Sequence, residues 1–165
     1  MAARKSIFIT GAASGIGRAV AIHFAERGWF AGLADIDEAG LAETAAAIPA
    51  GHSATYRLDV RNRHEWAEAL AQFWGDAGQR LDVLFNNAGV GRGGPIADVP
   101  QDETDLVIDV NLKGVVYGAE AGFRYLRDTP GSCLLNTASA AGIVGMTSAG
   151  ACTSSINTPS PPIGN

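Results

Sequence analysis

The stretch Thr10-Gly11-Ala12-Ala13-Ser14-Gly15-Ile16-Gly17 decides the fold, because it places three glycines between two segments of different periodicity. Residues 6–10 form a short β-rich run, and from Gly15 onward the pattern becomes helical. In this strand-to-helix context a glycine-rich turn indicates a dinucleotide-binding site. Gly11 permits a tight turn, Gly15 lets the backbone approach a pyrophosphate, and Gly17 lets the helix pack closely on the sheet. The start of the helix then offers free N–H groups to the phosphates.

Strand-like and helix-like segments alternate along the rest of the chain. Further strands are expected at 29–35, 52–58, 81–86 and 132–137, with helical segments between them, the first ending at Gly28 and the last covering about 102–127. This alternation predicts βαβ units, and right-handed crossovers then cover both faces of a parallel sheet with helices. We therefore predict an α/β fold with a doubly wound parallel sheet of five strands, within three αβα layers. The glycine turn is typical of the Rossmann type, which implies the strand order 3-2-1-4-5.

Local signals indicate how individual helices begin and which faces they bury. The first helix carries residues at helical spacing that predict its buried stripe: Ile16, Ala19, Val20, His23 and Phe24. Asp37 is placed to cap the second helix, with Ile36 and Leu41 spaced as a hydrophobic staple. Asn62 and Glu65 have the spacing of a capping box at the start of the third helix.

Composition and charge exclude several classes of protein. The 165 residues suit one domain, and 47% apolar with 18% charged residues is typical of a globular protein. The net charge is -5 with scattered Lys and Arg, so we expect no nucleic-acid partner. Cys133 and Cys152 have neither metal nor redox spacing, which predicts no metal site and a reduced, cytoplasmic setting. The first five residues are too short for a signal peptide, and no apolar run is long enough for a membrane span.

The composition changes near the end of the chain. After about Ser155 the sequence carries three prolines and shows no periodicity. We therefore predict a dinucleotide-binding domain at 1–151 and an irregular or disordered tail at 152–165.

Asp35 closes the second predicted strand and bears on the choice of dinucleotide. A carboxylate at this point accepts hydrogen bonds from the adenosine ribose hydroxyls and repels a 2′-phosphate. No Arg or Lys lies in the glycine turn or directly after Asp35 to reverse that choice. The sequence therefore predicts NAD(H) as cofactor. Asp37 is the alternative carboxylate, although its position suits a helix cap better.

The spacing T-G-x-x-x-G-x-G resembles the signature of the short-chain dehydrogenase/reductase family, and further segments match that family in the same order. They are Asp59-Val60, Asn86-Asn87-Ala88-Gly89, Asn111 within V-N-x-x-G, and Ser139 at the end of Asn136-Thr137-Ala138-Ser139. The resemblance implies a set of cofactor-binding residues, with the Asp-Val pair against the adenine: Gly11, Ser14, Gly15, Ile16, Gly17, Asp35, Asp59, Val60, Asn87, Ala88 and Gly89.

The resemblance also implies a reaction. Family members exchange a hydride between NAD(P)(H) and an alcohol or ketone, and they are usually homo-oligomers. Asn111 matches the Asn that holds a water in the proton relay, and Ser139 matches the Ser that hydrogen-bonds the substrate oxygen. The expected partner is therefore a small alcohol or ketone, and the loop at 90–95 is expected to border its site.

The family's Y-x-x-x-K motif is where this sequence departs from the pattern. In this chain, Cys152 occupies the position of the Tyr and Ile156 occupies the position of the Lys. In the family the Tyr hydroxyl exchanges a proton with the substrate oxygen, which requires its pKa of about 10 to be lowered toward neutrality. The Lys ammonium lowers that pKa and holds the nicotinamide ribose. Ile156 can do neither, and the side chain of Cys152 is shorter than that of Tyr. We therefore expect weak or no NADH binding and no measurable turnover from this chain.

The departure suggests a hypothesis about the chain's end. The family continues through a further helix and two more strands, so we expect a truncated or frameshifted product of a dehydrogenase gene that lacks the last strands. The fifth strand would then be an exposed edge, and the helix at 102–127 would expose an apolar patch. Three readings stay open, namely a short-chain oxidoreductase, a non-catalytic NAD-binding domain, and a fragment that folds poorly.

Overall fold

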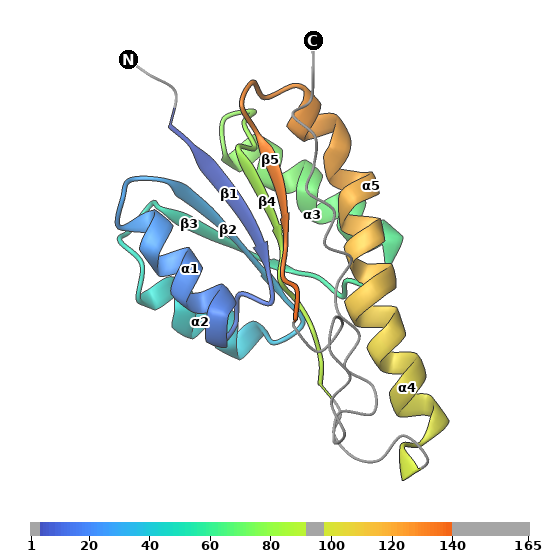
Figure 1. The fold of residues 1–165 in the computed structure, drawn as a ribbon. Helices are drawn as coiled ribbons and strands as arrows, with labels where there is room; N and C mark the ends of the chain where they lie inside the picture. Colours follow the sequence, from blue (N-terminus) through green and yellow to red (C-terminus); the bar gives the residue numbers. More distant parts are fainter. Residues whose placement is uncertain (1–3, 92–97, 140–165) are drawn as a thin grey trace.

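The strands pair side by side in a single parallel sheet (Figure 1). In the computed structural model, which describes residues 4–91 and 98–139, they are β1 (Ser6–Thr10), β2 (Phe30–Asp35), β3 (Ser53–Arg57), β4 (Val83–Asn86) and β5 (Cys133–Asn136). Their order in the sheet is β3-β2-β1-β4-β5. The predicted α/β fold and strand order are therefore confirmed.

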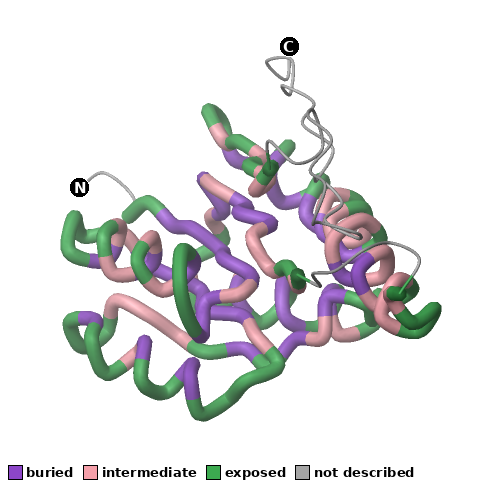
Figure 2. Tube along the Cα trace, turned by 60° about the horizontal axis from the view of Figure 1, so that its bottom comes forward, coloured by how far each residue is buried: buried purple, intermediate pink, exposed green. Residues whose placement is uncertain are grey.

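The central strand β1 is buried along its whole length, which explains its continuous apolar run. Thr10 lies opposite Ala34 of β2, and Ile9 lies opposite Phe85 of β4. This register brings the carboxyl ends of the strands to one edge of the sheet, where ligands bind in open parallel sheets. Figure 2 shows the buried residues concentrated along the strands and the helix faces that cover them.

Helices cover both faces of the sheet and enclose two separate cores (Figure 1). On one face, α1 (Gly15–Ala25) and α2 (Glu38–Ala46) pack over Ile7, Ile9 and Leu33. On the other face, α3 (Arg63–Asp76) and α5 (Gly114–Arg127) pack over Phe8 and Leu84. Successive residues of β1 therefore contribute to opposite cores, as the period-2 alternation of a strand requires.

The first helix follows its predicted stripe only in part. Val20 and Phe24 of that stripe are partly buried against the core, whereas Ile16 is 62% exposed. The fully buried residues are Gly17, Ala21 and Ala25, whose small side chains let the helix axis approach the sheet closely. The helix and its end near Gly28, which has φ +82°, are as predicted.

The caps of α2 and α3 follow the predictions in part. Asp37 caps α2 by accepting a hydrogen bond from the Gly40 amide at 3.0 Å. The staple is wrong, because Leu41 is buried while Ile36 is 61% exposed and lies outside that core.

At the start of α3, Asn62 Oδ1 accepts from the His64 amide at 2.9 Å, as a capping residue does. The reciprocal hydrogen bond of a capping box, from the Asn62 backbone amide to the Glu65 side chain, is replaced by other bonds. Glu65 accepts from the Asn62 side chain and from the Asp59 amide, while the Asn62 amide donates to the Asp59 carbonyl. The first turn of α3 is thereby tied to the segment that follows β3.

The predicted long helix at 102–127 is observed as three consecutive helical segments. They are α4 (Gln101–Ile108), the π-helical segment η2 (Asp109–Lys113) and α5. The inner face of α5 packs on α3 and the sheet, whereas Val116 and Phe123 are 38% and 55% exposed on its outer face. These two exposed apolar side chains do not by themselves establish the contiguous patch that was predicted for this helix. Within the described residues, β5 pairs only with β4, so it is an edge strand there.

Several predictions fall outside the described residues. These are the tail at 152–165, the family positions at Cys152 and Ile156, and most of the loop at 90–95. Within 4–91 and 98–139, no helix has the length and apolar character that crossing a membrane would need.

Candidate dinucleotide-binding site

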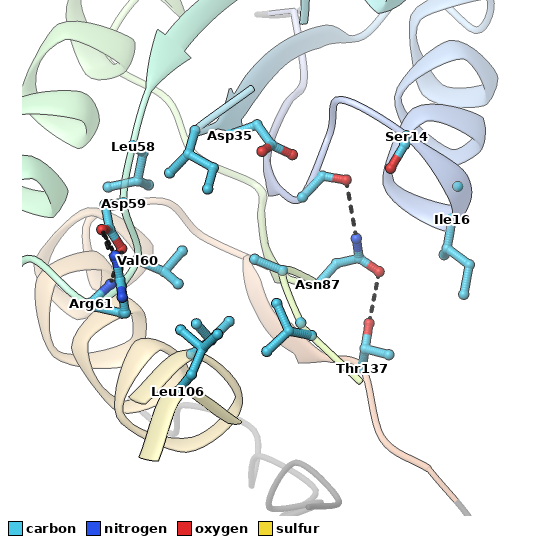
Figure 3. A pocket seen from close by; sticks show the side chains of 17 residues that line it. Ser14, Ile16, Asp35, Leu58, Asp59, Val60, Arg61, Asn87, Leu106 and Thr137 are labelled. Carbon is cyan, nitrogen blue, oxygen red and sulfur yellow. Dashed lines mark hydrogen bonds and ion pairs between the residues drawn. The ribbon is translucent and has the colours of Figure 1, made fainter. Parts of the chain in front are cut away.

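An open cavity of about 680 Å³ lies at the carboxyl edge of the sheet (Figure 3). Its walls come from the turns that follow β1, β2, β3 and β4, from α4 and η2, and from Thr137 after β5. The lining residues are Gly11, Ser14, Gly15, Ile16, Asp35, Ile36, Leu58, Asp59, Val60, Arg61, Asn87, Ala88, Gly89, Val90, Leu106, Val110 and Thr137. Ten of the eleven predicted cofactor-binding residues are in this set, and the eleventh, Gly17, packs behind it.

The glycine turn forms one side of the cavity and depends on the absence of side chains. Gly11 has φ +70°, and a Cβ there would lie 2.9 Å from Ala88 Cα. A Cβ on Gly17 would lie 2.1 Å from the Gly11 carbonyl oxygen. Gly15 also has positive φ, at +53°, and the space where its Cβ would stand is open. The turn therefore folds tightly on itself and leaves room beside Gly15 for a ligand.

The first helix begins with amide groups that no capping side chain occupies. Ser14 is the N-cap residue in an extended conformation, and its hydroxyl makes no capping hydrogen bond. The first N–H groups of a helix have no partner within the helix, and they carry the positive end of its dipole. The site is therefore suited to an anionic group such as a pyrophosphate.

A polar network joins the ends of β1, β4 and β5 at the floor of the cavity (Figure 3). Asn87 Nδ2 donates to the Thr10 carbonyl at 3.1 Å. Thr137 Oγ1 donates to Asn87 Oδ1 at 3.0 Å, a bond that Figure 3 shows. The Thr10 hydroxyl accepts from the amides of Asn87 and Ala88. These bonds fix the turn after β4 against the glycine turn. Thr137 was not among the predicted site residues, and its position at the end of a strand was the available signal.

Asp35 stands at the end of β2 and faces the cavity from above the glycine turn (Figure 3). Its Oδ2 accepts from the Ala13 amide and its Oδ1 from the Asp37 amide, each at 3.1 Å. Asp37 is occupied by the cap of α2 and does not line the cavity. Arg18, which directly follows the glycine turn, pairs with Glu43 at 2.9 Å. Of the two carboxylates considered, Asp35 is therefore the one placed for a ligand.

Asp59 and Arg61 form an ion pair on the opposite wall, across the cavity from Ser14 and Ile16 (Figure 3). The guanidinium binds the carboxylate through Nε at 2.9 Å and Nη2 at 2.6 Å. Hydrogen bonding from Arg61 lowers the pKa of Asp59, despite the opposing effect of its partial burial. Sequence reasoning did not identify Arg61, although an Arg directly after the Asp-Val pair was a visible signal.

Apolar side chains line the space between Asp35 and this ion pair. Leu58 and Val60 are buried, and Leu106 and Val110 approach from α4 and η2. The exposed Ile36 lies on the rim of the same region.

Asn111 lies in η2, beside the cavity wall. Its Oδ1 accepts from the Val90 amide at 2.8 Å, and its Nδ2 donates to the Val90 carbonyl at 2.9 Å. Both polar groups therefore hold the turn after β4. Ser139 is exposed and does not line the cavity. Among the described residues, no three His, Cys, Asp or Glu side chains gather in a group that could hold a metal ion.

These features define a dinucleotide-type cleft on a doubly wound sheet, and the comparison with known families agrees. The family model described as short chain dehydrogenase matches residues 5–155, so the chain belongs to the short-chain dehydrogenase family. It is 40% identical over 152 residues to a probable oxidoreductase, EphD, of Mycobacterium bovis, which covers 90% of this chain. It is 33% identical over 141 residues, or 86% of this chain, to the meso-2,3-butanediol dehydrogenase of Serratia marcescens.

The solved structures agree with the fold. A short chain dehydrogenase/reductase from Burkholderia phymatum, in complex with NAD, matches 91% of this chain and 55% of its own with a TM-score of 0.82 at 34% identity. Levodione reductase matches 87% of this chain and 57% of its own with a TM-score of 0.81 at 32% identity. The chain spans 26% of the EphD protein and 55% of the butanediol dehydrogenase.

Proposed function

We propose that this chain is the NAD(H)-binding part of a short-chain dehydrogenase-type oxidoreductase, and that the chain itself binds the dinucleotide without turning over substrate. The family's reaction is hydride transfer between a nicotinamide dinucleotide and an alcohol or ketone. Bound NAD(H) would supply the hydride-transferring nicotinamide. The chain's own residues would hold the pyrophosphate and the adenosine. We also propose a cytoplasmic setting, on the cysteine usage of the sequence.

One observation supports the cofactor most strongly, namely that Asp35 and the open start of α1 line the same cavity. The helix start favours the pyrophosphate, while the Asp35 carboxylate would accept hydrogen bonds from the ribose hydroxyls and would repel a 2′-phosphate. The two together fit NADH better than NADPH. Asn87 and Thr137 would hold the strand ends beneath the dinucleotide, since they are already bonded to each other.

The absence of turnover rests on the identity of two residues. Cys152 and Ile156 stand where the family has Tyr and Lys. An isoleucine carries no charge with which to lower a neighbouring pKa or hold a ribose, and the cysteine side chain is shorter than that of Tyr. Proton transfer to the substrate oxygen would therefore lack its usual donor.

The cofactor proposal is tested by fluorescence titration of NADH and NADPH into the full-length chain. The wild type should bind NADH more tightly, and Asp35→Ala should shift the ratio of the two affinities toward NADPH by about tenfold or more, since the repelling charge is gone. Glu68→Gln removes a similar charge on α3, where Glu68 pairs with His64 away from the cavity, and should leave the ratio unchanged. Absence of saturable NADH binding to the folded wild type would refute the proposal.

Turnover is tested separately, with NAD and a panel of secondary alcohols. We expect no NADH formation above the background rate, even at concentrations where binding is saturated. Turnover at an ordinary enzymatic rate of about 1 per second or more would overturn the non-catalytic part of the proposal. It would leave the cofactor assignment intact.

A further inference from the structure

Arg61 is a charged residue of the cavity that the proposed function leaves unused. It lines the wall opposite the glycine turn, beside Asp59 and Val60 (Figure 3). This wall lies beyond Asp35 along the proposed path of the adenosine, so the group that reaches it would be the adenine base. The side chain of Arg61 is 44% exposed, although its charge is paired.

The Asp59 carboxylate fixes the orientation of Arg61, because it accepts hydrogen bonds from both the backbone and the guanidinium of this residue. Its backbone amide donates to Asp59 Oδ1 at 3.0 Å, and its Nε and Nη2 grip the same carboxylate. Asp59 is fixed in turn, because its amide donates to Glu65 Oε2 at 2.8 Å in the first turn of α3. A side chain that is already ordered loses little entropy when a ligand binds, and this favours its use in recognition.

The Nη1 group of the guanidinium remains available to donate hydrogen bonds to a ligand. Arginine has five N–H donors, and the Asp59 carboxylate occupies those of Nε and part of Nη2. Nη1 makes no hydrogen bond within the described residues. The apolar side chains of Leu58 and Val60 adjoin this end of the cavity, where a flat base would bring its ring nitrogens toward the wall.

We propose that Arg61 is a cofactor-binding residue that donates a hydrogen bond from Nη1 to a ring nitrogen of the adenine base, with Asp59 holding the guanidinium in place. This inference rests on the proposed NAD(H) function and extends it to the recognition of the base. Adenine carries acceptor nitrogens on its ring, and a charged donor makes a strong bond to such an acceptor. Arg61 also offsets the negative charge of Asp59 on the wall where the base would lie.

The test compares NADH with three analogues in which C–H replaces N1, N3 or N7 of the adenine, one at a time. The wild type should bind one of the analogues about tenfold more weakly than NADH, as expected for a lost hydrogen bond to a charged group. Arg61→Gln should bind NADH more weakly and distinguish that analogue from NADH by less than about twofold. A role of Arg61 in folding alone would lower all affinities together and would leave the ratio unchanged.

Arg63→Gln is the matched control, because Arg63 lies two residues away, pairs with Glu120, and does not line the cavity. It should retain the wild-type discrimination, and thermal unfolding of both variants checks that they are folded. The inference is overturned if the wild type binds all three analogues as tightly as NADH, or if Arg61→Gln keeps the full discrimination. Failure of the proposed function is a different result, in which neither the wild type nor either variant binds NADH.

Discussion

At the scale of single residues, the glycines of this chain differ in how strictly their positions require them. A Cβ on Gly17 would overlap the Gly11 carbonyl group, at 2.1 Å from its oxygen and 2.7 Å from its carbon. Gly75 lies in α3, and a Cβ there would meet nothing within 4 Å. The first glycine is needed for close approach of two backbone segments, whereas the second only adds flexibility to a helix.

These two sites give a matched pair of substitutions. Gly17→Ala should lower the free energy of unfolding by about 3 kcal/mol or more and abolish NADH binding, because the turn must open to admit the methyl group. Gly75→Ala should raise it by about 0.5–1 kcal/mol and leave binding unchanged, because alanine is the better helix former. Urea denaturation and NADH titration of both variants provide the measurements. Equal effects of the two substitutions on stability would contradict this account of the turn.

At the scale of elements, a partly buried hydrogen bond links strand β3 to helix α3. Tyr56 is 4% exposed, and its hydroxyl donates to Asp76 Oδ2 at 2.8 Å. Burial, followed by the neighbouring Asp76 carboxylate, raises the pKa of Tyr56 above its ordinary value of 10.0. The folded protein therefore keeps this proton at pH values where the unfolded chain releases it. Stability from this residue is complete below pH 10 and is lost as the pH rises further.

The Tyr56→Phe variant tests this dependence. Near pH 7 it should be less stable than the wild type by about 1–3 kcal/mol, the usual cost of losing a hydrogen bond to a charged acceptor. Above pH 10 the wild type should lose its advantage by about 1.4 kcal/mol per pH unit, since only the wild type can ionise here when it unfolds. Urea denaturation of both proteins from pH 7 to pH 11 measures the difference, and other titrating groups cancel. A constant difference across that range would refute the assigned pKa direction.

Sequence patterns predicted the elements of this fold better than the contacts between them. The strands, the helices and the glycine turn followed from hydrophobic periodicity and glycine spacing, which are local properties. The strand order followed from the Rossmann type that this turn indicates. Ile16 in the predicted stripe of α1 and Ile36 in the predicted staple of α2 were misplaced because both are apolar residues on the rim of a cavity, where burial in a core does not govern their placement. The pairing of Asn111 with Val90 depends on how η2 meets the turn after β4, and that contact between distant segments leaves no periodic signal.

At the scale of the whole molecule, residues from all five strand ends line the cavity. Turns after four strands, two helical segments and Thr137 all line it, and the two hydrophobic cores lie on opposite faces of the same sheet. A ligand that contacts all these walls can bind only when the sheet is assembled. Binding should therefore stabilise the fold as one unit rather than a single loop.

The coupling between NADH binding and folding determines how much NADH stabilises the protein. At a free NADH concentration of about 100 times its dissociation constant, the free energy of unfolding should rise by about 2.7 kcal/mol. For a chain of this size, that corresponds to an increase in the melting temperature of roughly 5–10 °C. Reduced nicotinamide mononucleotide at the same concentration should stabilise much less, because it lacks the adenosine that would lie between Asp35 and the Asp59–Arg61 wall. Equal shifts with both compounds would mean that the adenosine half of the cavity contributes nothing, against the placement argued from Asp35.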